Sequence, residues 1–190
     1  LARVASSHIR VGTFEFFAAR QDLEGLKKLL DYSIDRHFAD KQEIKTLELL
    51  NAVIHKTALL IAHWMSLGFI HGVMNTDNMS ISGETLDYGP CAFMDEFNFN
   101  KVFSYVDRNG RYAYQQQPII AQWNCARLAD CLSLLHKKRG FQYVPEMNSL
   151  IEDFPNIYQK YWLQLMRAKL GLIRAEDSDE HLINLWLKML

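Results

Sequence analysis

The sequence predicts an α+β protein that is mainly helical, with one small β element. Three observations carry this prediction. The chain of 190 residues is 49% hydrophobic and contains only 9 Gly and 4 Pro, as ordinary globular domains do. Apolar residues recur every three or four positions over most of its length. Alternation with a period of two is confined to residues 79–88. We therefore expect one domain with one sizeable core.

Composition excludes several classes of protein. The 21 Lys and Arg residues nearly balance the 22 Asp and Glu residues, and no basic block occurs, so we expect no nucleic-acid partner. No apolar stretch approaches the roughly 20 residues that span a bilayer, so we expect no membrane segment. Cys91, Cys125 and Cys131 form no CxxC pair, which argues against a disulfide scaffold and is typical of a reducing compartment. We expect Cys125 and Cys131 to be small core residues.

The first third of the chain predicts two helices after an extended start. Residues 1–13 are rich in β-branched residues and predict a strand or loop, after which a helical pattern begins. Asp22 is the predicted N-cap of a helix whose apolar face is formed by Leu26, Leu29, Leu30 and Ile34. A longer helix is predicted over residues 42–67, with Gly68 as its C-cap.

The remainder alternates a polar stretch with further helices. Residues 79–88 predict a small strand that turns around Gly83, and residues 91–116 predict a loop with a turn at 107–110. Helices are predicted over residues 118–136, 146–154, 156–170 and 178–190. Trp64, Trp123, Trp162 and Trp186 lie in apolar helical patterns, and we expect them in the core.

Residues 71–78 (HGVMNTDN) and the later Asp87-Tyr88-Gly89 carry the chemistry. A long helix, this loop, a hairpin and then Asp-x-Gly is the layout of the protein-kinase catalytic loop H-R-D-x-x-x-x-N followed by D-F-G. His71, Asn78 and Asp87 match the kinase His, Asn and D-F-G Asp. An amide oxygen and a carboxylate are hard ligands that suit Mg²⁺ beside nucleotide phosphates. The alternative is that Asn78 and Asp87 are turn residues of the hairpin.

The position of the kinase base is occupied by Val73, which accepts no proton. A carboxylate is present nearby at Asp77, which acts either as a displaced base or as a helix cap. The pattern leaves two alternatives open: an inactive kinase relative, or a nucleotide and acceptor arranged differently around Asp77. We expect His71 to hold the loop by hydrogen bonds rather than to move protons.

Longer strings resemble the selenoprotein O family, whose bacterial group is called YdiU. They are RVASSHIRVGTFEFF at residues 3–17, HGVMNTDNMSI at 71–81, DYGPCAFMD at 87–95, parts of 112–124, and 167–172. The resemblance implies a protein-kinase-like fold in which residues 1–15 end the N-lobe and 16–190 form the C-lobe.

The family binds ATP in a flipped orientation and transfers AMP to Ser, Thr or Tyr hydroxyls of proteins. By resemblance, Asp77 is the catalytic acidic residue and Asn78 and Asp87 hold Mg²⁺, or Mn²⁺ in its place. Asp87, Arg3 and Arg10 would contact the nucleotide, and paired guanidinium groups suit phosphate oxygens. Because Arg3 and Arg10 are seven residues apart, a bend at Gly12 or at the Ser6–Ser7 pair would be needed to bring them together.

The resemblance also implies what this chain would lack. The glycine-rich loop, the phosphate-binding Lys and its partner Glu would lie before Arg3, and a further region would follow residue 190. We therefore expect a central fragment that is inactive alone, from a parent in the bacterial cytoplasm or in a eukaryotic mitochondrion. The alternative function is a catalytically inactive, nucleotide-binding pseudokinase scaffold, which Val73 motivates.

Overall fold

The computed structural model of the chain describes residues 4–38, 46–139 and 143–190, and these form a mainly helical protein. The α-helices are α1 (Val11–Ala19), α2 (Leu23–Phe38), α3 (Thr46–Leu67), α4 (Gln117–Ser133), α5 (Tyr143–Glu152), α6 (Phe154–Leu170) and α7 (Asp179–Leu187). Short 3₁₀ helices are η1 (Thr76–Asn78), η2 (Tyr114–Gln116) and η3 (Leu134–Arg139). The strands β1 (Phe69–Ile70) and β2 (Ala92–Phe93) form one antiparallel pair.

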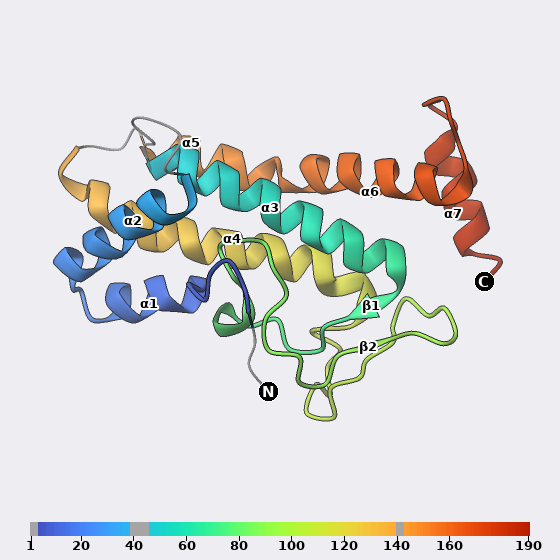
Figure 1. Cartoon of the computed structure of the whole chain (residues 1–190), viewed down its shortest axis with the longest axis horizontal. Coiled ribbons are helices and arrows are strands. Elements are labelled where there is room, and N and C mark those ends of the chain that lie inside the picture. Colours follow the sequence, from blue (N-terminus) through green and yellow to red (C-terminus); the bar gives the residue numbers. More distant parts are fainter. Residues whose placement is uncertain (1–3, 39–45, 140–142) are drawn as a thin grey trace.

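Helix α3 is the centre of the fold and packs against both α4 and α6 (Figure 1). Helices α1 and α2 lie at one end of this layer, and α7 lies at the other end, after α6 (Figure 1). The long connection between α3 and α4 runs along one side of the helices and contains residues 71–90. The candidate site is therefore carried by irregular segments on a rigid helical support.

The helix ends follow the predicted caps. Asp22 precedes α2, and its Oδ1 accepts a hydrogen bond from the Gly25 N–H at 2.8 Å. Helix α3 ends at Gly68, whose φ of 71° is the left-handed conformation that glycine adopts without strain. Residues 42–45 of the predicted long helix lie outside the described residues. The N-cap prediction and the C-cap prediction are both confirmed.

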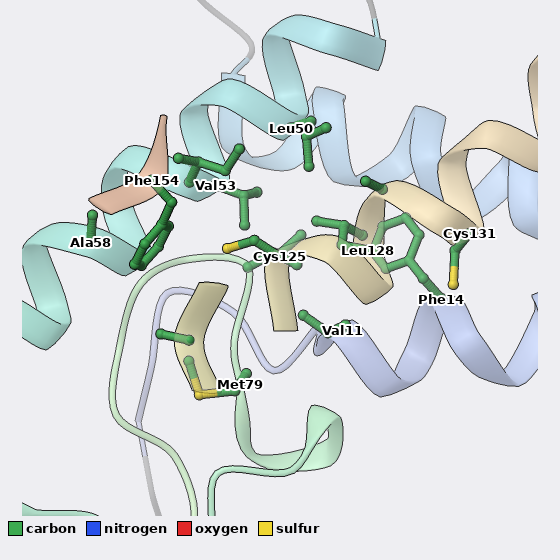
Figure 2. Packing of buried hydrophobic residues seen from close by; sticks show 14 of the residues in the cluster. Val11, Phe14, Leu50, Val53, Ala58, Met79, Cys125, Leu128, Cys131 and Phe154 are labelled. Atoms are coloured by element: carbon green, nitrogen blue, oxygen red, sulfur yellow. The ribbon is translucent and has the colours of Figure 1, made fainter. Parts of the chain in front are cut away.

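The core joins α1, α3, α4, α5 and α6 in one cluster of buried side chains (Figure 2). Phe14, Leu50, Leu128 and Phe154 are members of this cluster, which packs the N-terminal helix onto the same centre as the later ones. Cys125 also lies in it, with 1% of its surface exposed.

Both core cysteines are free thiols. Burial raises the pKa of Cys125 and of Cys131 to about 12, so both thiols stay protonated and unreactive. The prediction that these two cysteines are core residues is confirmed.

The small β element is not where the sequence placed it. The strands are β1 and β2, with Phe69 opposite Phe93, whereas residues 79–88 contribute only isolated bridges, one of them between Met79 and Thr85. The physical reason is that the backbone of residues 79–81 pairs with the N-terminal segment. Such a partner, about 70 residues away in sequence, leaves no trace in local alternation.

The prediction for the tryptophans is confirmed for two of them. Trp64 and Trp162 are buried, Trp186 is partly buried against the cluster that contains Trp162, and Trp123 is 38% exposed. The guanidinium carbons of Arg111 and Arg127 lie 4.8 and 5.6 Å from the centre of the Trp123 ring. Trp123 is thus a surface residue with cation–π partners, and its assignment to the core was wrong.

Within the described ranges, no helix combines the length and the apolar character needed to cross a bilayer.

Candidate active site

The N-terminal segment runs antiparallel to residues 79–84, directly before α1. The Val11 N–H donates to the Met79 carbonyl at 2.9 Å, and the Ile81 N–H donates to the Ile9 carbonyl at 3.1 Å. Between them Arg10 forms a bridge with Ser80. These pairs share one register, so Arg10 is fixed beside the chain that leaves η1. Figure 1 shows the dark-blue N-terminal segment beside the green one.

His71 ties the loop of residues 71–78 to the segment that carries Asp87. The side chain is fully buried, and its Nε2 lies 2.7 Å from the carbonyl oxygen of Leu86. Its Nδ1 accepts the Val73 N–H at 3.3 Å, and the two bonds together are satisfied by the neutral tautomer protonated at Nε2. Burial lowers the pKa of His71, which favours this neutral form. The prediction that His71 is structural is confirmed.

The same two segments touch again at Gly72 and Pro90. The φ of Gly72 is 86°, and a Cβ placed on it would lie 2.9 Å from Cγ of Pro90. Glycine therefore permits both the left-handed turn and the close approach. Asp87 lies in sequence between Leu86, which is bonded to His71, and Pro90, which meets Gly72. Its side chain is exposed, and its φ is 58°. The fold thus holds the backbone on both sides of Asp87 against the loop of residues 71–78.

Two buried amide side chains of α4, those of Gln117 and Asn124, form hydrogen bonds with the backbone of residues 69–74. Oε1 of Gln117 accepts the His71 N–H at 3.0 Å, while its Nε2 donates to the Phe69 carbonyl at 2.9 Å. Nδ2 of Asn124 donates to the Met74 carbonyl at 2.9 Å. Because both amides are almost fully buried, these bonds are costly to break and the loop is rigidly placed.

Asn78 ends η1 with 8% of its surface exposed. Its Nδ2 donates to the Val73 carbonyl at 2.9 Å, so the amide is oriented and its oxygen faces the other way. An amide oxygen and the Asp87 carboxylate are a hard-oxygen set that fits Mg²⁺ or Mn²⁺. Over the described ranges, no group of three or more His, Cys, Asp or Glu side chains could hold a metal. A cation held by Asn78 and Asp87 therefore needs further ligands, as phosphate oxygens and water provide.

Asp77 is exposed and lies against the first turn of α1. A Cβ on Gly12 would lie 2.2 Å from Oδ1 of Asp77, so the carboxylate occupies the space that a larger residue would take. The first turn of a helix carries partial positive charge, which favours a carboxylate there. The neighbouring Thr76 hydroxyl donates to Glu15, which also fixes η1 against α1.

Arg10 offers a cation with unused hydrogen-bonding capacity. Its Nε is buried and has no hydrogen-bond partner in the part of the chain that the structure describes. A buried guanidinium N–H without an acceptor is costly and suits an anionic ligand, such as a phosphate oxygen. Arg3 lies outside the described residues, so its convergence with Arg10 stays a prediction.

The backbone bends at Ser6, and the Ser7 hydroxyl accepts the Ile9 N–H at 3.0 Å. A bend at the serine pair is therefore present, while a bend at Gly12 is wrong, because Gly12 lies inside α1. Glycine at position 12 permits the contact with Asp77 instead. Sequence reasoning missed this role, and also that of Glu84, which accepts hydrogen bonds from Ser6.

The sequence was compared with those of known proteins and protein families. The sequence model of one family, described as protein adenylyltransferase SelO, matches residues 1–190. A protein from Agrobacterium fabrum, named protein nucleotidyltransferase YdiU, is 52% identical over 190 residues, which are 99% of this chain and 39% of that protein. Proteins of the same name from Chromobacterium violaceum and Bacillus cytotoxicus are 51% and 54% identical, over 100% and 96% of this chain and 40% and 38% of their own lengths.

The chain thus spans about two-fifths of the length of these curated relatives. The family match itself covers every residue, including the loop of residues 71–78 and the segment around Asp87. The chain belongs to the SelO family of protein adenylyltransferases.

Proposed function

We propose that this chain carries the catalytic and metal-binding side of an enzyme that transfers AMP from ATP to Ser, Thr or Tyr hydroxyls of proteins. The observation that carries the proposal is the joining of the loop that contains Asp77 and Asn78 to the segment that contains Asp87. The His71–Leu86 hydrogen bond and the close approach of Gly72 to Pro90 connect the loop to that segment. Family membership makes a nucleotide the expected substrate.

In this reaction the hydroxyl oxygen of the acceptor attacks the α-phosphorus of ATP. The bond from that phosphorus to the oxygen bridging to the β-phosphate breaks, and pyrophosphate leaves. The proton of the hydroxyl passes to Asp77, which is exposed and lies against the first turn of α1. Val73 could not take this proton, which is why the carboxylate four residues later is the proposed acceptor.

Arg10 is proposed to neutralise charge on the triphosphate, with Arg3 beside it. Its buried Nε without a partner in the described part of the chain supports this role. Asn78 and Asp87 would hold Mg²⁺, or Mn²⁺ in its place. The cation would supply further neutralisation of the phosphates and of the pyrophosphate that leaves.

A protein-kinase-like arrangement is part of the proposal. Residues 1–15 would end the N-lobe, and residues 16–190 would form the C-lobe. What supports it is the order of the elements: α3, the loop of residues 71–78, the turn around Gly83, and then Asp87-Tyr88-Gly89. The activity is proposed for a polypeptide as long as the curated relatives, in which this chain occupies about two-fifths.

The second candidate is a scaffold that binds ATP without transfer, and Val73 at the position of the kinase base favours it. ATP labelled separately on the α- and γ-phosphates distinguishes the candidates, using a polypeptide of the relatives' length that contains this chain. Protein labelled from α-phosphate alone supports AMP transfer. Label from the γ-phosphate indicates a kinase, and ATP binding with neither label indicates the scaffold.

A further inference from the structure

Three groups of Ser6, its N–H, its hydroxyl and its carbonyl, are hydrogen-bonded to two side chains from different parts of the fold. Its N–H donates to the two carboxylate oxygens of Glu84 at 3.0 and 3.3 Å, and its hydroxyl donates to Oε2 of the same residue. Its carbonyl accepts from Nε and from the second terminal nitrogen of Arg36, at 3.2 and 3.0 Å. The N–H, the carbonyl and the hydroxyl of Ser6 are thus all engaged in hydrogen bonds.

We propose that Glu84 and Arg36 are positioning residues for the nucleotide. By holding Ser6, they set the register of residues 6–11 against residues 79–84, and so direct Arg10 toward the phosphates of ATP. We call Ser6, Arg36 and Glu84 the serine clamp. The inference rests on the proposed function of Arg10.

Glu84 is suited to this role as an ionised acceptor. Besides Ser6, the Ser82 hydroxyl donates to its Oε2 at 2.7 Å. Hydrogen bonds from the Ser6 and Ser82 hydroxyls lower the pKa of Glu84, so the carboxylate is charged and accepts from all of them. Charge-assisted bonds of this kind are stronger than neutral ones.

Arg36 connects the clamp to the helical support. It belongs to α2, and its remaining terminal nitrogen donates to the Tyr32 hydroxyl, one turn earlier on that helix, at 3.2 Å. The guanidinium is thus held by its own helix while it donates to the Ser6 carbonyl. Ser6 is therefore fixed relative to α2 as well as to the hairpin of residues 79–85.

The position of Ser6 matters because Arg10 follows it by only four residues, after the bend at Ser6. The backbone of residues 9–11 pairs in one antiparallel register with that of residues 79–81, and the Glu84 side chain holds Ser6 before these pairs begin. A slip of one residue would turn every side chain of an extended segment to its opposite face. Such a slip would turn the Arg10 side chain to the opposite face of the segment.

The test is a double-mutant cycle of Glu84→Ala and Arg10→Ala, in a polypeptide of the relatives' length that contains this chain. The readouts are the dissociation constant for Mg-ATP, measured by calorimetry, and KM and kcat for AMP transfer. Glu84→Ala is expected to weaken ATP binding and raise KM about tenfold, with kcat changed less than about threefold. In the Arg10→Ala background the same change is expected to add less than about twofold, because Glu84 acts through Arg10.

Two variants separate positioning from folding. Glu84→Gln keeps an acceptor for the Ser6 N–H and is expected to bind ATP within about threefold of the parent. Glu24→Ala removes an exposed glutamate of α2 that pairs with Lys28, and is expected to change neither readout. Melting temperatures of all variants identify any that fail to fold. If Glu84→Ala is among them, Ser6→Ala, which removes only one hydroxyl, takes its place in the double-mutant cycle.

The two proposals fail in different ways. Additive losses of ATP affinity from Glu84→Ala and Arg10→Ala, or no loss from either clamp variant, would overturn the clamp even if the parent transfers AMP. A parent that binds Mg-ATP with the expected non-additive cycle but transfers no AMP would overturn the proposed activity and leave the clamp standing.

Discussion

The side chain of Asp77 lies so close to Gly12 that position 12 has no room for a side chain of its own. A Cβ at position 12 would lie 2.2 Å from Oδ1 and 3.1 Å from Cγ of Asp77. The two residues are 65 positions apart in sequence, and the hydrogen bond from the Val11 N–H to the Met79 carbonyl brings them together. The first turn of α1 therefore fixes where the proposed proton acceptor lies.

Gly12→Ala is expected to reduce AMP transfer while leaving the fold intact. The added methyl group displaces the Asp77 carboxylate, and a misplacement of about 1 Å can cost about 100-fold in rate. We expect kcat to fall at least about tenfold. Alanine is otherwise favoured over glycine inside a helix, so the free energy of unfolding should change by less than about 1 kcal/mol.

Rates with labelled ATP and urea unfolding check this prediction. Ala19→Gly, at the exposed end of the same helix, is the matched control for helix propensity and should leave the rate unchanged. Full activity of Gly12→Ala would show that the position of Asp77 does not limit the reaction.

The pH dependence of stability is expected to carry the signature of His71. Burial lowers its pKa from the ordinary 6.5, so below about pH 6.5 the unfolded chain binds more protons than the folded one. The stabilisation from neutral His71 is therefore complete above pH 6.5 and is lost as the pH falls toward the lower pKa of the folded state. Protonation at Nδ1 would also break the bond that this atom accepts from the Val73 N–H.

Urea unfolding of the parent and of His71→Gln between pH 7.5 and 5 tests this. The parent should lose more stability on acidification than the variant does. The pKa of His37 is lowered as well, mainly by burial. Acidification therefore lowers the free energy of unfolding through His37 equally in both proteins, and this contribution cancels when the two are compared. Equal pH slopes in the two proteins would contradict the role given to His71.

Val73→Asp is expected not to create a protein kinase. A carboxylate there restores only the residue that kinases use as base, while the proposed site presents the α-phosphate of ATP to the acceptor and uses Asp77. The main-chain carbonyl of residue 73 accepts the hydrogen bond from Nδ2 of Asn78, so the substitution of the side chain leaves this bond in place. Labelling from ATP carrying a γ-phosphate label is the measurement, and incorporation of that label by the variant alone would refute the proposed geometry.

Features set by neighbours in sequence were predicted well. The Asp22 cap and the Gly68 C-cap depend on residues within one helical turn, and the sequence contains both signals. His71 was expected to hold its loop, and its two ring nitrogens do so. The kinase-like spacing of Asn78 and Asp87 was also readable, because both lie in one short stretch.

Features set by distant segments were not predictable from local pattern. Nothing around Gly12 or Glu84 indicates that they meet Asp77 and Ser6, since each contact spans more than 60 residues. Trp123 was misassigned for a related reason: an apolar helical pattern does not say which face another element covers. Family resemblance supplied the proposed role of Asp77, which the pattern alone left open between base and cap.

The most direct test of AMP transfer is intact mass spectrometry of a polypeptide of the relatives' length, containing this chain, after incubation with Mg-ATP. The parent is expected to gain the mass of one or more AMP groups, and Asp87→Ala should gain none. Asp87→Asn, which removes the charge yet tolerates the φ of 58°, should also gain none. A phosphate-sized gain in the parent, or undiminished AMP on both variants, would contradict the account.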